Sequence, residues 1–122
     1  MAKIKCLIRD KEISATKEES VRQSFLSHLI FSLEYPKSDI KVEVPIKHGS
    51  SEVLDVETNK KKRADIVIYE SGSQEDVKAI IEVKKQHEKS GEEQVKSYGN
   101  VTNAKYLVWH NGSDATLTWK RV

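Results

Sequence analysis

The sequence has little cysteine, proline and glycine and no long apolar run, and each scarcity excludes a class of protein. The 122 residues include one cysteine, two prolines and five glycines. The single thiol, Cys6, excludes an internal disulfide and any zinc site built from several cysteines, and it favours a reducing, cytoplasmic location. No apolar stretch approaches the roughly 18 residues of a membrane span, so no membrane partner is expected. The apolar patch at residues 6–8 is too short for the core of a secretory signal peptide.

Net charge is also low. The chain carries 21 Lys and Arg against 19 Asp and Glu, a formal charge of +2. Any nucleic-acid surface must therefore be a local patch rather than a global positive field. The length suits one domain with one core, so we expect residues 1–122 to form a single domain with residues 1–15 as an N-terminal extension. The sequence does not decide between a free-standing domain and the N-terminal part of a longer protein.

Apolar periodicity predicts the order helix, three strands, helix, two strands. Helical spacing of Val21, Phe25 and Leu29 predicts a first helix over residues 17–33, with Thr16 as its N-cap. Weaker helical spacing predicts a second helix over residues 88–101, and residues 47–62 are interpreted as a loop or a loosely ordered hairpin. Strands are predicted at residues 40–46, 64–69, 77–83, 105–109 and 116–119. This order is typical of an α/β or α+β sandwich built on one mixed sheet.

Acidic and basic side chains occur where two apolar strands are expected to meet. Glu82 and Lys84 share one face at the end of an apolar strand, because side chains alternate along a strand. Asp65 begins the preceding strand, where Asp is disfavoured. If the two strands form an antiparallel pair, Asp65 lies beside Glu82 or Lys84. For Glu82 and Lys84 alone, the simpler interpretation is a strand that has reached solvent.

Two carboxylates and an ammonium at one end of a sheet suit phosphodiester chemistry. Carboxylate oxygens left partly open to water are ligands that Mg²⁺ prefers. A metal held by Asp65 and Glu82 would activate water and neutralise charge on the phosphate. Lys84 would orient the water or stabilise the transition state.

These residues resemble the PD-(D/E)xK nuclease superfamily. Asp65 followed by Glu82-x-Lys84 matches the superfamily motif, and Gln94 with Tyr98 looks like the QxxxY motif of the N-terminal nuclease domain of type I restriction enzyme R subunits. Further similar segments are residues 18–23, 35–36, 42–46, 63–69 and 111–112. The resemblance implies a restriction-endonuclease-like core, in which one mixed central β-sheet is flanked by helices. The sequence departs from the family pattern in having Ala64, not proline, before Asp65.

The resemblance also implies roles for single residues. Asp65 and Glu82 would be metal ligands for Mg²⁺, which Mn²⁺ can replace, and Lys84 would be the catalytic lysine. Gln94 and Tyr98 would lie beside the active site and DNA. Glu19 would complete the metal site, although the sequence does not decide firmly between Glu19 and its neighbour Glu18 for this role.

The implied function is a Mg²⁺-dependent DNA endonuclease of a restriction system, with DNA as substrate and motor, methyltransferase or specificity subunits as partners. Cutting both strands of a duplex would need two copies, hence a homodimer or a larger assembly. The alternative is a catalytically inert module on the same fold that binds nucleic acid or protein.

Simpler interpretations remain open for the supporting residues. Gln94 and Tyr98 are also compatible with an ordinary helix face packed on the sheet. Glu19 is compatible with a first-turn charge that only favours the helix dipole. Lys62 and Arg63 end a basic run that is either a solvated loop or a contact to the phosphate backbone.

Overall fold

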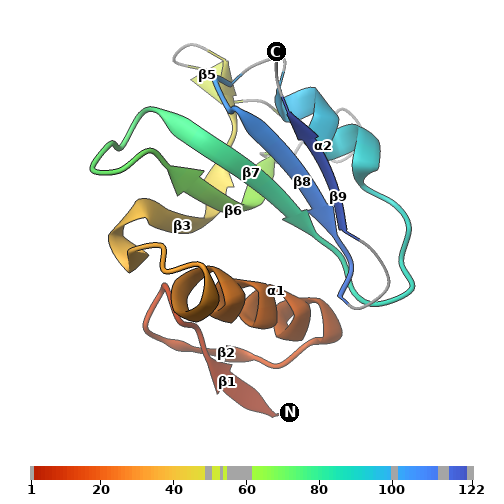
Figure 1. Cartoon of the computed structure of the whole chain (residues 1–122). Coiled ribbons are helices and arrows are strands. Elements are labelled where there is room, and N and C mark those ends of the chain that lie inside the picture. Colours follow the sequence, from red (N-terminus) through yellow and green to blue (C-terminus); the bar gives the residue numbers. More distant parts are fainter. Residues whose placement is uncertain are drawn as a thin grey trace.

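A five-stranded sheet with a helix on each face forms the centre of the molecule (Figure 1). The computed structural model describes residues 2–48, 51–52, 54, 62–99, 102–112 and 116–120. The strands lie in the order β3 (Ile40–Pro45), β6 (Arg63–Tyr69), β7 (Val77–Val83), β8 (Tyr106–His110) and β9 (Thr116–Lys120). The β7–β8 pair is parallel and the other pairs are antiparallel. The predicted mixed sheet is therefore confirmed.

Helix α1 (Lys17–Ser27) covers one face of the sheet. The Thr16 hydroxyl accepts a hydrogen bond of 3.1 Å from the Glu19 N–H, as its predicted role as N-cap requires. The buried Leu26 packs in one cluster with Ile66 and Ile81. The predicted helix over residues 17–33 is confirmed, with its last part a wider π-helical turn, η1 (His28–Ser32); a short 3₁₀ turn, η2 (Lys37–Asp39), follows.

Helix α2 (Glu92–Tyr98) covers the opposite face. Val95 and Tyr98 pack there with Ile80 of β7. The prediction that this helix begins at residue 88 was wrong, because the helix begins at Glu92. Residues 84–91 instead form a connector that leaves the end of β7, and Gly91 adopts a left-handed φ of +97° directly before the helix. The predicted end of the helix, at residues 100–101, lies outside the described residues.

Two small hairpins flank the sheet. Strands β1 (Lys3–Lys5) and β2 (Glu12–Ser14) form an antiparallel pair on the far side of α1 from the sheet (Figure 1). The sequence of this extension gives no signal for these strands, since neither has more than one apolar residue. Strands β4 (Lys47–His48) and β5 (Ser51–Glu52) pair antiparallel, so of the two alternatives predicted for residues 47–62, a loop or a hairpin, the described residues of this segment include a hairpin pair. None of the helices in the described ranges is long and apolar enough to cross a membrane.

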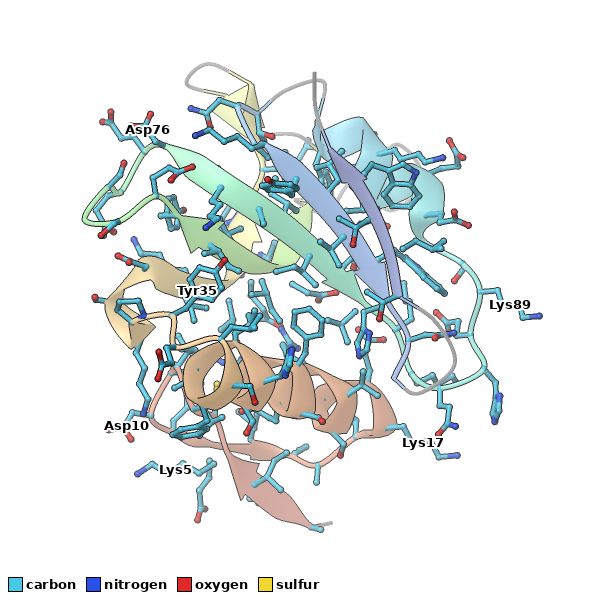
Figure 2. The ribbon with its side chains drawn as sticks, in the orientation of Figure 1. Lys5, Asp10, Lys17, Tyr35, Asp76 and Lys89 are labelled. Atoms are coloured by element: carbon cyan, nitrogen blue, oxygen red, sulfur yellow. The ribbon has the colours of Figure 1, made fainter. Side chains whose placement is uncertain are left out.

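The register of β6 and β7 fixes where the candidate site lies. Ile66 pairs with Ile81, so Asp65 and Glu82 are neighbours across the antiparallel ladder. The start of β6 and the end of β7 therefore meet at one end of the sheet. Asp76, in the turn that joins these strands, lies at the other end, away from Lys89 of the connector (Figure 2).

Candidate active site

Asp65 and Glu82 lie side by side at the end of the sheet where β6 begins. Asp65 Oδ2 accepts a hydrogen bond of 2.7 Å from the backbone N–H of Val83, the residue after Glu82. This bond ties the aspartate to the neighbouring strand and fixes its side chain. Glu82 is 4% exposed although it is a carboxylic acid. The antiparallel pairing predicted from sequence thus brings the two carboxyl groups together.

The environment of Glu82 opposes its ionisation. Burial is the largest cause that raises its pKa, followed by a hydrogen bond and charge repulsion from Asp65, while Lys84 acts in the opposite direction. Glu82 Oε2 is buried and has no hydrogen-bond partner among the described residues. A buried oxygen without a hydrogen-bond partner lowers the stability of the fold, because its lost hydration is not replaced. A cation at this position would relieve both the repulsion and the missing partner.

Lys84 extends from the first residue after β7. Its backbone N–H donates to the His110 carbonyl at 2.8 Å, which continues the parallel ladder with β8 beyond the last residue of the strand. The ammonium nitrogen lies 3.8 Å from Glu88 Oε2, and the side chain is 19% exposed. Its charge acts on Glu82 and on Glu18. The lysine therefore stands among carboxylates, as the sequence motif predicted.

The two glutamates at the start of α1 have different surroundings. Glu18 is half-buried, and burial, followed by the charge of Asp65, raises its pKa, while Lys84 lowers it. Glu19 is 8% exposed, and its oxygens lie 3.0 Å from Arg9 Nη2 and 2.9 Å from Arg22 Nε. Glu18 is thus the glutamate whose pKa responds to the charge of Asp65, whereas Glu19 is bound to two arginines.

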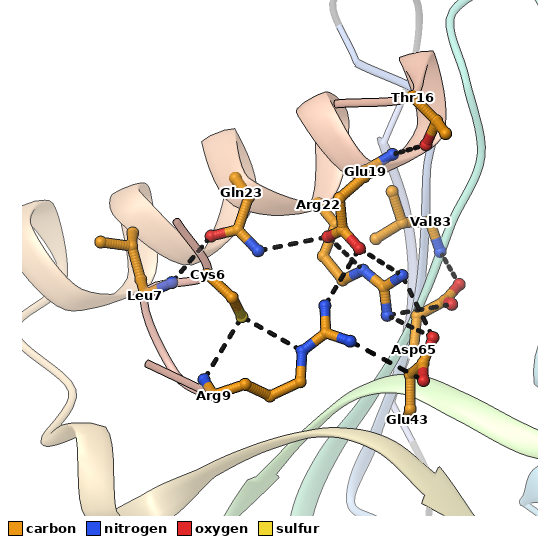
Figure 3. A network of polar contacts seen from close by, with 10 residues as sticks. All are labelled: Cys6, Leu7, Arg9, Thr16, Glu19, Arg22, Gln23, Glu43, Asp65 and Val83. Atoms are coloured by element: carbon orange, nitrogen blue, oxygen red, sulfur yellow. Dashed lines mark hydrogen bonds and ion pairs between the residues drawn. The ribbon is translucent and has the colours of Figure 1, made fainter. Parts of the chain in front are cut away.

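Glu19 belongs to a network that supports the site from the side of α1 (Figure 3). Arg22 Nη1 lies 3.8 Å from Asp65 Oδ1, and Arg22 Nη2 lies 3.4 Å from Glu43 Oε1. Arg9, in the turn between β1 and β2, lies 3.8 Å from Glu43 Oε2. Glu43 adopts a left-handed φ of +51°, which is strained for a residue with a side chain. The network fixes Asp65 between two secondary-structure elements.

Sequence reasoning missed three members of this network. Arg22 follows Glu19 at a spacing of three residues on the predicted helix, a spacing that allows a side-chain pair and could have suggested it. Glu43 reads as an ordinary outward residue of an edge strand. Arg9 lies in a segment without apolar periodicity, so no sequence signal pointed to it.

Tyr98 and Gln94 stand on the face of α2 that covers the sheet beside Glu82. Gln94 Nε2 donates to the Tyr98 hydroxyl, which donates to the backbone carbonyl of Arg63 at 3.2 Å. Burial, followed by the charge of Glu82, raises the pKa of the Tyr98 hydroxyl. The structure therefore brings Tyr98 to the carboxylates and ties it to the first residue of β6.

Lys62 and Arg63 directly precede the strand that carries Asp65. Arg63 is exposed and Lys62 is half-buried. The Lys62 carbonyl accepts a hydrogen bond of 2.9 Å from the Ile46 N–H, which ties this end of the strand to the segment after β3. Both cations lie within three residues of Asp65 along the chain. The rest of the basic run, residues 60–61, lies outside the described residues.

The donor set fits a hard divalent cation. In the described ranges, no group of three or more His, Cys, Asp or Glu side chains is close enough to hold a metal ion, so a closed site of protein ligands is not formed there. Mg²⁺ is usually bound by one or two carboxylates, with water and substrate phosphate as the other ligands. Asp65 and Glu82 with its orphaned oxygen supply such a pair.

Comparison with known proteins gives one match. The family model described as the type I restriction enzyme R protein N terminus matches residues 17–121, which confirms the resemblance seen in the sequence motifs. Comparison with curated proteins and with solved structures gave no significant match.

Proposed function

The chain belongs to the type I restriction enzyme R protein N-terminal family, and from this premise we propose that it is a metal-dependent DNA nuclease domain of a restriction system. The observation that carries the proposal is the pair formed by Asp65 and Glu82, with Lys84 beside it and with a buried Glu82 oxygen that has no hydrogen-bond partner in the described part of the chain. Burying two carboxyl groups at the end of a sheet lowers the stability of the metal-free protein. A bound cation would compensate this cost by pairing with the carboxylates.

Asp65 and Glu82 are the residues that would hold Mg²⁺ or Mn²⁺. When bound, the ion supplies a nucleophilic water at neutral pH and offsets the charge that develops on phosphorus. Glu18 adds negative charge beside Asp65 and takes the place that the sequence motif gave to Glu19. Arg22 keeps Asp65 oriented toward the neighbouring strand.

Lys84 carries hydrogen-bond donors and no acceptor, so it can hold the attacking water or neutralise a phosphate oxygen. Removing one such contact typically lowers the rate by about 10²–10³-fold. Gln94 and Tyr98 close the site from the side of α2. Lys62 and Arg63 would contact the phosphate backbone, a kind of contact that fixes the position of the protein on DNA and not its sequence preference.

The test is nicking of supercoiled plasmid with Mg²⁺ or Mn²⁺, with the wild type compared with Lys84→Ala and Glu82→Ala purified in parallel. We expect metal-dependent nicking by the wild type and its loss in both variants, while circular dichroism shows that both remain folded. Wild-type cleavage by either variant would contradict the assignment.

Calorimetric titration with Mn²⁺ separates the nuclease from an inert binding module. Loss of binding in Glu82→Ala supports a metal site at the carboxylate pair. A folded wild type that neither nicks DNA nor binds Mn²⁺ would instead support a module without chemistry. Light scattering under cleaving conditions then tests the homodimer expected for cleavage of both strands, because a monomer that makes double-strand breaks would contradict it.

A further inference from the structure

We propose that Gly91 is a positioning residue for Lys84: its missing side chain leaves the space through which the lysine reaches the carboxylates. Only the expected effect of Gly91 on catalysis depends on the proposed function of Lys84; the positioning of the lysine does not. A methyl group on Gly91 would lie 2.7 Å from Cε and 3.6 Å from Nζ of Lys84. The first distance is well inside van der Waals contact between two carbon atoms. Any side chain at position 91 must therefore displace the end of the lysine.

The backbone at Gly91 cannot move aside easily, because the connector that carries it is fixed at two points. Trp109 Nε1 donates to the Ser90 carbonyl at 2.8 Å, and Asn111 Nδ2 donates to the Glu88 carbonyl at 2.9 Å. Both donors belong to buried residues, at 3% and 2% exposure. They anchor the connector to β8 and to the residue that follows it, and β8 is the strand beside the one that carries Glu82.

Lys84 is held from its other side as well. Its backbone N–H is bound to the His110 carbonyl, and its ammonium nitrogen lies 3.8 Å from Glu88 Oε2. The lysine thus passes between an anchored backbone at Gly91 and a carboxylate of the same connector. The free end of a flexible side chain yields before an anchored backbone does. A side chain at position 91 therefore changes the place of the ammonium group more than it changes the fold.

The chain offers a matched control for backbone strain. Gly72, in the turn between β6 and β7, also has a left-handed φ, of +73°, and a methyl group there would meet no atom of the described residues within 4 Å. Alanine is strained at a left-handed φ in either position. Only Gly91→Ala adds a contact with Lys84. The methyl group at position 91 would also lie 3.5 Å from Trp109 Nε1, an ordinary van der Waals distance. The part of the Gly91→Ala effect that is due to the lysine is therefore the part that disappears when Lys84 is already alanine.

The first experiment measures coupling through stability and needs no catalytic activity. Urea midpoints are measured for the wild type, Lys84→Ala, Gly91→Ala and the double variant, with Gly72→Ala in both backgrounds. We expect Gly91→Ala to lower the midpoint less when Lys84 is already alanine, because the steric conflict is then absent. Gly72→Ala should lower the midpoint equally in both backgrounds. Equal decreases for Gly91→Ala in both backgrounds would overturn the proposal.

The second experiment follows the lysine directly. The ¹³Cε resonance of Lys84 is assigned as the lysine signal missing from Lys84→Ala, and it should shift in Gly91→Ala but not in Gly72→Ala. If Gly91→Ala does not fold, Gly91→Asn takes its place, since asparagine tolerates a left-handed φ and still carries the methylene group. An unshifted Lys84 resonance in a folded position-91 variant would overturn the proposal.

The third experiment connects position to catalysis. We expect plasmid nicking to fall about 100-fold in Gly91→Ala, as for a catalytic group displaced by about 1 Å, and to stay within about twofold of wild type in Gly72→Ala. Mn²⁺ affinity should be unchanged in both. Unchanged nicking by Gly91→Ala beside an active wild type would overturn the proposal. If the wild type itself does not nick, the proposed nuclease function fails, and the stability cycle and the resonance still decide whether Gly91 positions Lys84.

Discussion

Arg22 links Asp65 to Glu19: its guanidinium lies 3.8 Å from Asp65 Oδ1 and 2.9 Å from Glu19 Oε2. One side chain of α1 therefore holds the aspartate of β6 while it neutralises a buried glutamate of its own helix. The arrangement explains why a nearly buried arginine lies beside a site that would hold a cation. Three acidic residues share its charge, Glu43 being the third.

Removing Arg22 should destabilise the fold strongly. Arg22→Met leaves the buried Glu19 without its main partner, and we expect a loss of about 3–5 kcal/mol in the free energy of unfolding. Urea denaturation measures it. The double variant with Glu19→Met should recover part of the loss, because the unpaired charge is gone. As a control, Lys5→Ala removes the exposed Lys5–Asp10 pair and should leave the midpoint unchanged.

Substitutions of Glu18 and of Glu19 should have different effects on Mn²⁺ affinity and on stability. Glu18→Gln is expected to lower Mn²⁺ affinity by about 10–100-fold, the usual cost of losing a group that supports metal ligands, with little change in stability. Glu19→Gln should do the reverse, because its carboxylate is bound to two arginines. Calorimetric titration and urea denaturation of both variants give the comparison. A loss of affinity only in Glu19→Gln would restore the assignment made from sequence.

Glu82 should make the metal-free protein less stable as the pH rises. Its pKa in the folded state is raised above the ordinary value of 4.5, so the stability it contributes is complete below that value and is lost as the pH rises toward the folded pKa. Glu82→Gln lacks this dependence. Above pH 4.5 we expect the free energy of unfolding of the variant to rise relative to that of the wild type by up to about 1.4 kcal/mol per pH unit. Parallel stability–pH curves in EDTA would contradict this.

Metal binding should release a proton at neutral pH. The raised pKa of Glu82 beside Asp65 means that the pair holds a proton until a cation displaces it. We expect release of about one proton for each Mn²⁺ bound at pH 7, and an affinity that increases with pH. Calorimetry in buffers of different ionisation enthalpy counts the proton. Binding enthalpies that do not depend on the buffer would show that the pair is already ionised.

Tyr98→Phe tests the hydrogen bonds that join α2 to β6. The variant leaves the Arg63 carbonyl and the Gln94 amide without the hydroxyl, so we expect a loss of about 1–3 kcal/mol. Tyr106→Phe, on the half-buried tyrosine of β8, is the control and should cost less. Urea denaturation compares the two. Equal effects would mean that the Tyr98 hydroxyl contributes no more than that of an ordinary tyrosine.

The strands and the carboxylate pair were predictable because their signals are local. Alternation and β-branched runs located β3, β6 and β7, and the turn between β6 and β7 made the strands antiparallel, so Asp65 met Glu82. The start of α2 was misplaced because it depends on bonds from Trp109 and Asn111, which lie far along the chain.

The choice between Glu18 and Glu19 could not be made from the sequence for a similar reason. Adjacent residues of a helix point about 100° apart. Which of the two faces Asp65 depends on the rotation of α1 against the sheet. That rotation is set partly by Arg9, whose hairpin has no apolar pattern. Contacts made through distant polar side chains were therefore the part that the sequence alone could not supply.

The hydrogen bond from the Lys84 N–H to the His110 carbonyl has a consequence for synthesis of the chain. The lysine, both carboxylates and Gly91 all precede β8, yet the lysine backbone and its connector are anchored only when β8 and Asn111 pair with them. Contacts that close long stretches of chain form late in folding. A nascent chain that has emerged only as far as α2 thus contains every proposed reactive group without their arrangement. The site can therefore form only after β8 and Asn111 have been synthesised.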